Sequence, residues 1–255
     1  MGWALITGAS SGMGLEYAKR LASMKYNLLL VSNQKEEQEK VAEELSQLHS
    51  TEARPFFLDL TQTDAADELF AYCQKESLQI DILINNAGMF FFEELSLENE
   101  SKALKMLQLH VYTPMRLCIL FGEEMKKRRF GYILNMSSMA AQLPCPGIAI
   151  YSATKAYLKS FSKSLYFEMR PYGVGVTTVC PAAIATPLYK LKPSLLSFGV
   201  KIGLIGTPQW LVRRAVRRMM QKRRVVKPGL MNYYLPPLIA LLPKWLVAKL
   251  WEKFK

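Results

Sequence analysis

Thr7-Gly8-Ala9-Ser10-Ser11-Gly12-Met13-Gly14 is the stretch that decides the fold, because its three glycines directly follow the short apolar run Ala4–Thr7. The run predicts a buried strand, and a helix-like pattern begins at Gly14. In a strand–turn–helix unit, the first glycine permits a tight turn, the second lets the backbone approach a pyrophosphate, and the third allows close helix–strand packing. The first N–H groups of the helix then attract phosphate oxygens. An ordinary strand–helix turn is the alternative.

Short apolar runs and helix-like stretches alternate along the rest of the chain. Further strands are predicted at Asn27–Val31, Pro55–Leu58, Ile80–Asn85, Gly131–Met136, Gly175–Cys180 and Val225–Val226. Helices are predicted at Gly14–Met24, Glu36–His49, Asp64–Glu76, Glu98–Arg128, Ile150–Met169 and Trp210–Met220. Strands that are apolar throughout indicate a sheet covered on both faces. The sequence therefore predicts an α/β fold, a Rossmann-type doubly wound parallel β-sheet flanked by helices in a single domain.

The bulk composition agrees with one enzyme-sized domain. The chain has 255 residues, of which 50% are hydrophobic, so it can fill one core. The first predicted strand begins so close to the N-terminus that no room is left for a signal peptide, and we expect a cytoplasmic protein. The four cysteines form no CxxC pair, and we expect neither disulfides nor a metal site.

A tyrosine and a lysine at helical spacing form the candidate reaction centre. Tyr151 and Lys155 lie four residues apart in Tyr151-Ser152-Ala153-Thr154-Lys155, so they share one face of the predicted helix. The lysine ammonium favours the phenolate and lowers the pKa of the tyrosine from its usual value of about 10. Such a phenol exchanges a proton with an alcohol or a ketone near neutral pH. The pair Ser137-Ser138 lies upstream of the tyrosine.

Together with Asn85-Asn86-Ala87-Gly88, these motifs resemble the short-chain dehydrogenase/reductase family in order and spacing, from about residue 3 to residue 188. The resemblance implies an oxidoreductase in which Ser138 binds the substrate oxygen and Tyr151 is the general acid or base. Lys155 would lower the pKa of the tyrosine and hold the nicotinamide ribose. Ser137 is expected to shape the loop instead.

The resemblance also implies which residues bind the nucleotide. The assigned residues are Gly8, Ser10, Ser11, Gly12, Met13, Gly14, Asn33, Lys35, Asp59, Asn86, Ala87, Gly88, Tyr151, Lys155, Pro181, Ile184 and Thr186. Asp59 would contact the adenine, Asn86–Gly88 would lie beside the adenosine ribose, and Ile184 and Thr186 would contact the nicotinamide amide. The alternative for Asn85-Asn86 is a simple strand-ending turn. Ala182 stands where the family usually has glycine.

The residues that end the second predicted strand bear on the choice of cofactor. Val31-Ser32-Asn33-Gln34-Lys35 contains neither the aspartate that repels a 2′-phosphate nor an arginine that binds one. The missing carboxylate, with Lys35, Ser10 and Ser11 nearby, favours NADP(H) over NAD(H). The alternative for Lys35 is a solvated residue in the first turn of the next helix.

His110 is a departure from the family pattern. The family usually has an asparagine in the long central helix, where its backbone carbonyl holds a water that relays protons to the lysine. Asparagine also helps a local kink there, and we expect histidine to help it less. We include His110 among the catalytic candidates because it could titrate near pH 6.5 and feed the proton relay. The alternative is a histidine that only fills space.

Two apolar segments predict a lipophilic substrate. Residues 187–206 form a long apolar loop, and Met89-Phe90-Phe91-Phe92 adds three aromatic rings near the same mouth. An aromatic-lined cleft favours a steroid, a 3-oxoacyl chain or a 3-ketosphingoid base, and thus a carbonyl reductase of lipid metabolism. Lid and core packing is the alternative for these residues. The alternative function is a non-catalytic, redox-sensing regulator that binds the nucleotide.

The C-terminal part carries the whole net charge. Residues 201–255 hold 13 of the 33 basic residues but only one of the 21 acidic residues. We expect a catalytic domain over residues 1–229 and a basic, apolar extension over 230–255. Its tryptophans and lysines suit peripheral contact with anionic membrane, while packing on a partner subunit or over the cleft is the alternative. We expect a homodimer or homotetramer, and no nucleic acid because no nucleic-acid module accompanies the charge.

Overall fold

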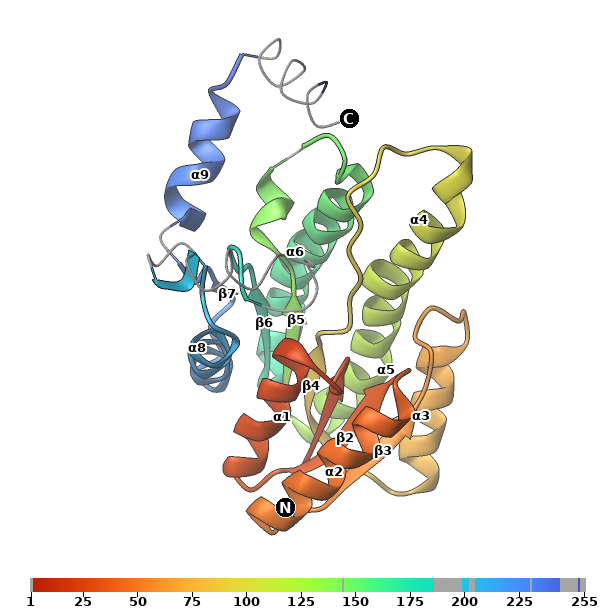
Figure 1. Cartoon of the computed structure of the whole chain (residues 1–255). Coiled ribbons are helices and arrows are strands. Elements are labelled where there is room, and N and C mark those ends of the chain that lie inside the picture. Colours follow the sequence, from red (N-terminus) through yellow and green to blue (C-terminus); the bar gives the residue numbers. More distant parts are fainter. Residues whose placement is uncertain are drawn as a thin grey trace.

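The computed structural model describes residues 2–143, 145–185, 199–201, 205–229, 231–243 and 252. Within them, one seven-stranded sheet has the order β3-β2-β1-β4-β5-β6-β7, and every strand pair is parallel (Figure 1). The strands are β1 (Trp3–Thr7), β2 (Asn27–Ser32), β3 (Ala53–Phe57), β4 (Ile80–Asn85), β5 (Gly131–Met136), β6 (Val174–Val179) and β7 (Val225–Val226). The Rossmann-type sheet expected from the sequence is confirmed.

Helices cover both faces of the sheet. The main helices are α1 (Gly12–Ser23), α2 (Lys35–His49), α3 (Ala65–Lys75), α4 (Glu100–Leu107), α5 (Thr113–Arg128), α6 (Ala149–Met169), α8 (Pro208–Met220) and α9 (Met231–Ala240). Shorter helices are η1 (Leu97–Asn99), η2 (Gln108–Tyr112), η3 (Met139–Gln142) and η4 (Arg170–Tyr172). Helices α1, α2 and α8 pack on one face, and α3, α5 and α6 pack on the other.

The strand periodicity explains why there are two hydrophobic cores. Successive side chains of a strand point to opposite faces of the sheet. In β1, Ala4 and Ile6 therefore join the core under α1, α2 and α8, whereas Trp3 and Leu5 join the core under α3, α5 and α6. Burial on both faces is why these strands are apolar throughout rather than alternating.

The central helix differs from the sequence prediction. The single helix expected over Glu98–Arg128 is divided into α4, the π-helical turn η2 and α5. A π-helical turn inserts one extra residue into a helix and is frequent at functional sites. His110 lies at the centre of η2, so this helix is locally distorted at the position of the histidine.

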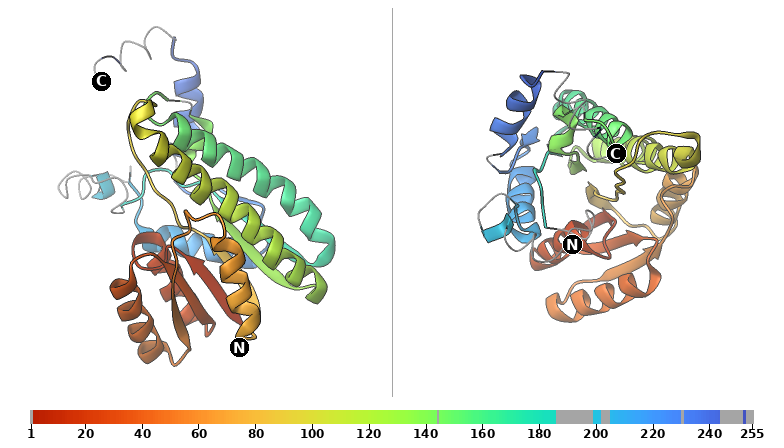
Figure 2. Two further views of the ribbon diagram at one scale, coloured as in Figure 1. Left: turned by 90° about the vertical axis from the view of Figure 1, so that its right-hand side faces the viewer. Right: turned by 45° about the horizontal axis from the view of Figure 1, so that its top comes forward.

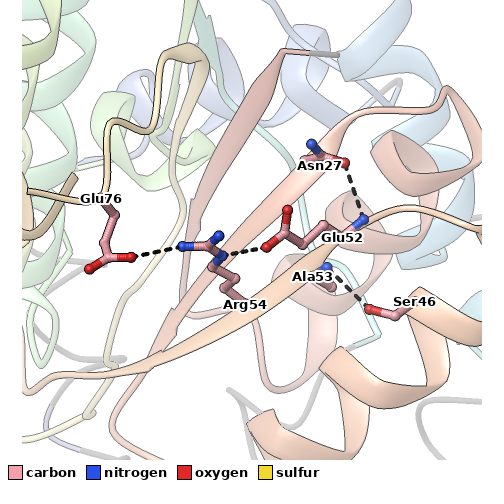
Figure 3. Close-up of polar contacts among 6 residues, drawn as sticks. All are labelled: Asn27, Ser46, Glu52, Ala53, Arg54 and Glu76. Carbon is pink, nitrogen blue, oxygen red and sulfur yellow. Dashed lines mark hydrogen bonds and ion pairs between the residues drawn. The ribbon is translucent and has the colours of Figure 1, made fainter. Parts of the chain in front are cut away.

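The edge strand β3 is held by polar contacts at its start (Figure 3). Arg54 lies 2.6 Å from Glu52 and 3.2 Å from Glu76, which follows α3. The backbone N–H of Glu52 donates to Asn27, and that of Ala53 donates to Ser46 on α2. The ion pairs are partly exposed and contribute about 0–1 kcal/mol each. These contacts lie at the amino-terminal end of β3, away from the carboxyl ends of the strands, so their role is to hold the edge strand in place.

The C-terminal helices lie at the β7 side of the molecule. Helix α8 buries an apolar face against α1 and the sheet, with Arg213, Arg214 and Arg217 exposed on its other face. Helix α9 contacts η3 and stands apart from the two helix layers (Figure 2). Among the described residues, no helix has the length and apolar character needed to cross a membrane. Most of the predicted apolar segment after Ala240 lies outside the described residues.

Candidate active site

A cavity of about 550 Å³ lies at the carboxyl ends of the strands. Its lining residues follow β1, β2, β3, β4, β5 and β6, and α6 contributes two side chains. The strand order reverses between β1 and β4, and parallel sheets bind ligands at such a switch point. Of the predicted site residues, the lining includes Gly8, Ser10, Ser11, Gly12, Met13, Asn33, Asp59, Asn86, Ala87, Gly88, His110, Ser138, Tyr151, Lys155, Pro181 and Ile184. Thr186 lies outside the described residues.

The glycine turn has the conformation that its sequence requires. Gly8 and Gly12 have φ values of +66° and +55°, in the left-handed region that other residues adopt at a cost. Gly14 lies behind the lining, where an added Cβ would come within 1.8 Å of the Gly8 carbonyl oxygen. Ser11 precedes α1, but its side chain makes no capping hydrogen bond. The first N–H groups of α1 are thus left for another acceptor.

The loop after β4 braces this turn. The side-chain amide of Asn86 donates to the carbonyl oxygens of Thr7, at 3.0 Å, and of Gly8, at 3.3 Å. The Thr7 hydroxyl accepts the backbone N–H groups of Asn86 and Ala87 and donates to the carbonyl of Ile84. Asn86 therefore supports the strand-ending turn as well as lining the cavity. The role of Thr7 was not predicted, although its place at the end of β1 was visible in the motif.

The end of β2 forms a closed polar network of neutral groups. Gln34 N–H donates to the Ser32 hydroxyl, Ser32 donates to Ser10 at 2.9 Å, and Ser10 donates to the Gln34 side-chain oxygen at 2.6 Å. This network joins the glycine turn to the start of α2. Lys35 is the first residue of α2, is exposed, and is not among the lining residues. Its contact with a 2′-phosphate stays a prediction.

Asp59 lies in the loop after β3. Burial would raise the pKa of its carboxyl, but hydrogen bonds from Thr61 and Gln62 outweigh burial and lower the pKa below its usual value. The N–H and hydroxyl of Thr61 both donate to one carboxylate oxygen, at 3.0 and 2.9 Å. Asp59 is therefore a fixed, ionised acceptor on the cavity wall, and its predicted contact with adenine stays a prediction.

The serine, tyrosine and lysine of the motif line this one cavity. Ser138 follows β5 and accepts the N–H of Ala140 at 3.1 Å, which leaves its hydroxyl proton to be donated elsewhere. Tyr151 lies in the first turn of α6 and is 5% exposed. The Lys155 ammonium lies 5.7 Å from the centre of the Tyr151 ring. The helical spacing thus places the cation near the aromatic ring of Tyr151, and its effect on the phenol pKa stays a prediction.

Lys155 is held from two sides. Its Nζ donates to the carbonyl of Met136 at 3.0 Å, and its own carbonyl accepts the Ser137 hydroxyl at 2.7 Å. Ser137 therefore joins α6 to the end of β5, and the loop-shaping role expected for it stays a prediction. Burial lowers the pKa of Lys155 to about 8, which leaves the side chain mainly charged at neutral pH.

His110 corrects one sequence hypothesis. Burial, assisted by the Lys155 charge, lowers the pKa of His110 well below 6.5, so the imidazole does not titrate near neutral pH. Its Nε2 accepts the Met89 N–H at 3.0 Å, and its Nδ1 lies 3.1 Å from the Thr154 hydroxyl. A ring with both nitrogens engaged does not exchange protons with a relay near pH 6.5. Thr154 and Met89 were not singled out for this contact because nothing in the sequence joins them to residue 110.

Apolar groups surround the reaction centre. Phe90 packs edge-on against Tyr151, with ring centres 5.0 Å apart. Met89, Ala182 and Ile184 also line the cavity. Phe92 is exposed, and most of the predicted substrate loop lies outside the described residues. Ile184 pairs with Gly206, the last residue of that loop.

These residues fit a nicotinamide dinucleotide. The cradle has no room for a side chain at Gly8 or Gly14, and Gly12 has a left-handed backbone conformation. The uncapped start of α1 suits a pyrophosphate. Asp59 would face the adenosine half, while Ser138, Tyr151 and Lys155 surround the other end. The described residues contain no cluster of three histidine, cysteine or acidic side chains arranged for a metal ion.

Comparison with known proteins gives consistent matches. The family model described as short chain dehydrogenase matches residues 2–194. Very-long-chain 3-oxoacyl-CoA reductase of Homo sapiens is 30% identical over 254 residues, covering 97% of this chain and 78% of that protein. The 17-beta-hydroxysteroid dehydrogenase type 3 of Mus musculus is 34% identical over 190 residues, covering 74% of this chain and 62% of that protein.

A solved structure extends the match to the fold. The short-chain dehydrogenase from Sphingobium yanoikuyae, in complex with NADPH, superposes with a TM-score of 0.80 at 26% identity. The superposition covers 96% of this chain and 97% of that one. The similarity therefore extends over nearly the whole length of both chains.

Proposed function

Because this chain belongs to the short-chain dehydrogenase/reductase family of oxidoreductases, which act on CH–OH groups with NAD(P), we propose that it reduces a lipophilic ketone with NADP(H) or oxidises the matching alcohol. The observation that carries this proposal is the single cavity that joins the glycine turn to Ser138, Tyr151 and Lys155. One end of that cavity suits a pyrophosphate, and the other holds a proton donor beside a cation.

The three side chains have complementary roles in this reaction. The bound nicotinamide supplies or accepts the hydride. Ser138 donates its free hydroxyl proton to the substrate oxygen and so places it beside Tyr151. Tyr151 gives its phenolic proton to that oxygen during reduction and takes it back during oxidation. Lys155 stabilises the phenolate left behind, because a nearby positive charge favours the ionised phenol.

The cavity wall supports a lipophilic substrate. Met89 and Ile184 line the cavity, and the ring of Phe90 lies against Tyr151. Apolar walls with a few convergent polar groups are typical of sites for lipophilic small molecules. The names of the similar proteins, a 3-oxoacyl-CoA reductase and a hydroxysteroid dehydrogenase, point the same way. We therefore place 3-oxoacyl thioesters, steroid ketones and 3-ketosphingoid bases first among the substrates to test.

The neutral end of β2 supports NADP(H). Ser10, Ser32, Asn33 and Gln34 line the cavity there without a carboxylate that would repel a 2′-phosphate. We expect a lower KM for NADPH than for NADH. We also expect Lys35→Glu to weaken NADPH binding while NADH binding is retained. Equal affinity of the wild type for both nucleotides would contradict this part of the proposal.

The decisive experiment follows NADPH oxidation by wild type and Tyr151→Phe with that ketone panel. We expect the variant to bind NADPH but to lose about 10²–10⁴-fold in turnover, the usual contribution of a general acid. Tyr157→Phe is the matched control, because Tyr157 is also on α6 but stacks on Phe161. Equal turnover in Tyr151→Phe would refute the mechanism. A wild type inactive on the whole panel would favour the nucleotide-binding regulator.

We also propose peripheral contact with anionic membrane through the basic C-terminal part. The described end of the chain exposes Tyr233, Tyr234, Leu238 and Leu241, with Leu241 at 81%. Residues 201–255 hold 13 basic residues and one acidic residue. Exposed aromatic and aliphatic side chains in a basic part of the sequence suit the interface of an anionic bilayer. Such a surface would bring the enzyme to a substrate dissolved in lipid.

A homodimer or homotetramer is supported by the outer face of the central helix. Leu104, Leu107, Tyr112 and Ile119 are each about 40–60% exposed at helical spacing along α4, η2 and α5. Apolar residues grouped on one face favour association between subunits. We propose that this face packs against its copy in a second subunit.

A further inference from the structure

His110 links two segments that meet only in the folded chain. The residue is 1% exposed and comes from the π-helical turn η2. On one side it contacts the loop after β4, where its Nε2 accepts the Met89 N–H at 3.0 Å. On the other side its Nδ1 lies 3.1 Å from the hydroxyl of Thr154 on α6. Its ring also packs edge-on against Tyr151, with ring centres 5.9 Å apart.

The donors and acceptors along this chain fix the state of the imidazole. A backbone N–H only donates, so Nε2 of His110 must carry a lone pair rather than a proton. The single hydroxyl proton of Thr154 is given to the Tyr151 carbonyl at 2.8 Å. The Thr154 oxygen must therefore accept the Nδ1 proton of His110. The ring is the neutral Nδ1–H tautomer, and the three bonds run in one direction, from Met89 to Tyr151.

We propose that His110 is a positioning residue that fixes the Met89–Phe90 backbone over Tyr151 and thereby sets the substrate-facing wall of the reaction centre. This rests on the proposed function, in which Tyr151 transfers the proton to the substrate. The imidazole packs closely against the backbone of the loop after β4, because a Cβ added to Gly88 would lie 3.1 Å from Nε2 of His110. Met89 lines the cavity and Phe90 packs on the Tyr151 ring, so a shift of this backbone moves both.

The charge around the ring keeps this link intact at working pH. Lys155 and Tyr151, both from α6, are the titratable side chains described beside the ring, and burial together with the lysine charge disfavours the imidazolium. A proton on Nε2 would face the Met89 N–H, so two donors would oppose each other. The contact between Nε2 and the Met89 N–H therefore requires a neutral ring, and burial together with the Lys155 charge favours the neutral form.

Two substitutions separate the two halves of the link. An asparagine amide occupies the place of Nδ1 and can donate to Thr154, but it is too short to reach Met89. A glutamine amide reaches the place of Nε2 and can accept the Met89 N–H, but it leaves Thr154 without that donor. We therefore expect His110→Asn to raise the KM for the ketone about tenfold, equivalent to about 1.4 kcal/mol. We expect kcat and the KM for NADPH to change less than about twofold.

His110→Gln should restore most of the low ketone KM, because it keeps the Met89 contact. His49→Asn, at the end of α2, is the control for replacing a histidine far from the site. A purely structural role for His110 would lower the amount of active enzyme, and hence the apparent kcat, without raising KM. A His110→Asn variant with the KM of the wild type, or equal KM values in His110→Asn and His110→Gln, would overturn the proposal.

A spectroscopic measurement tests the same link without any turnover. The chain has two histidines, so nitrogen NMR of protein labelled with ¹⁵N-histidine gives two ring systems, and His49→Asn assigns them. We expect His110 to show a protonated Nδ1 and an unprotonated Nε2 at neutral pH. A protonated Nε2 would overturn the proposal even if the enzyme is active. The expected spectrum from a protein inactive on every ketone would instead locate the failure in the proposed function.

Discussion

Lys155→Met is expected to make the nucleotide-free protein more stable at neutral pH while it abolishes ketone reduction. Burial lowers the pKa of Lys155 from 10.5 to about 8. At about 1.4 kcal/mol for each pKa unit, keeping this ammonium charged inside the protein costs about 3 kcal/mol. The substitution removes that cost but leaves the Met136 carbonyl without its donor, which costs about 1–3 kcal/mol. We expect a net gain of up to about 2 kcal/mol in the free energy of unfolding.

The stability of the wild type should rise with pH as the folded chain releases the Lys155 proton. Below the folded-state pKa of about 8, both the folded and unfolded chains carry the proton, so the full cost is present. Between about 8 and 10.5, the folded chain releases the proton while the unfolded chain keeps it, and stability rises with pH. From about pH 6.5 to about pH 9.5, the wild type should regain about 2 kcal/mol relative to Lys155→Met.

Urea denaturation of both proteins, followed by circular dichroism at several pH values, measures this difference. Other groups titrate in the same range, but they are common to both proteins and cancel in the comparison. Lys163→Met removes a partly exposed lysine from the same helix and controls for the loss of one basic residue. A stability difference between wild type and Lys155→Met that stays constant from pH 6.5 to pH 9.5 would refute the reasoning that burial suppresses this charge.

Three further predictions concern the glycine turn, the C-terminal part and the subunit contact. Gly14→Ala should weaken NADPH binding, measured by fluorescence titration, at least about tenfold, because its Cβ would lie 1.8 Å from the Gly8 carbonyl oxygen. Gly2→Ala is the control, because its Cβ would crowd the Asp81 side chain instead, and it should leave NADPH binding unchanged. Deleting residues 230–255 should abolish sedimentation with phosphatidylglycerol vesicles, and unaltered sedimentation would rule out the membrane proposal. Ile119→Glu should lower the mass found by light scattering toward that of a monomer; an unchanged oligomer would exclude the α5 face as the contact.

Local patterns in the sequence were sufficient to predict the architecture. Strands buried on both faces must be apolar throughout, and this marked β1, β2, β4 and β5. The Gly8–Gly14 turn was visible for an equally local reason, since left-handed backbone and close packing both require glycine. The boundaries were less certain, because residues such as Ala53 join a strand only through a partner across the sheet.

The reaction centre was predictable where it depends on spacing along one helix. Tyr151 and Lys155 share a face of α6 whatever surrounds them, so their proximity followed from four residues of separation. The state of Lys155 was not predictable in the same way. Its lowered pKa depends on burial, which exists only in the folded chain. The carbonyl that accepts from its ammonium belongs to Met136 on β5, which is distant in sequence.

By itself, the sequence determined the parallel sheet, the nucleotide turn and the pairing of phenol with ammonium, because each follows from periodicity or from the conformational needs of a few adjacent residues. Only the tertiary structure decided what His110 does. A free histidine is poised to titrate near neutral pH, and the sequence therefore suggested a proton carrier. In the folded protein, Met89 and Thr154 contact both ring nitrogens, and burial together with the Lys155 charge lowers the pKa of the ring. Those partners are separated from residue 110 by 21 and 44 positions, so no local pattern could have brought them together.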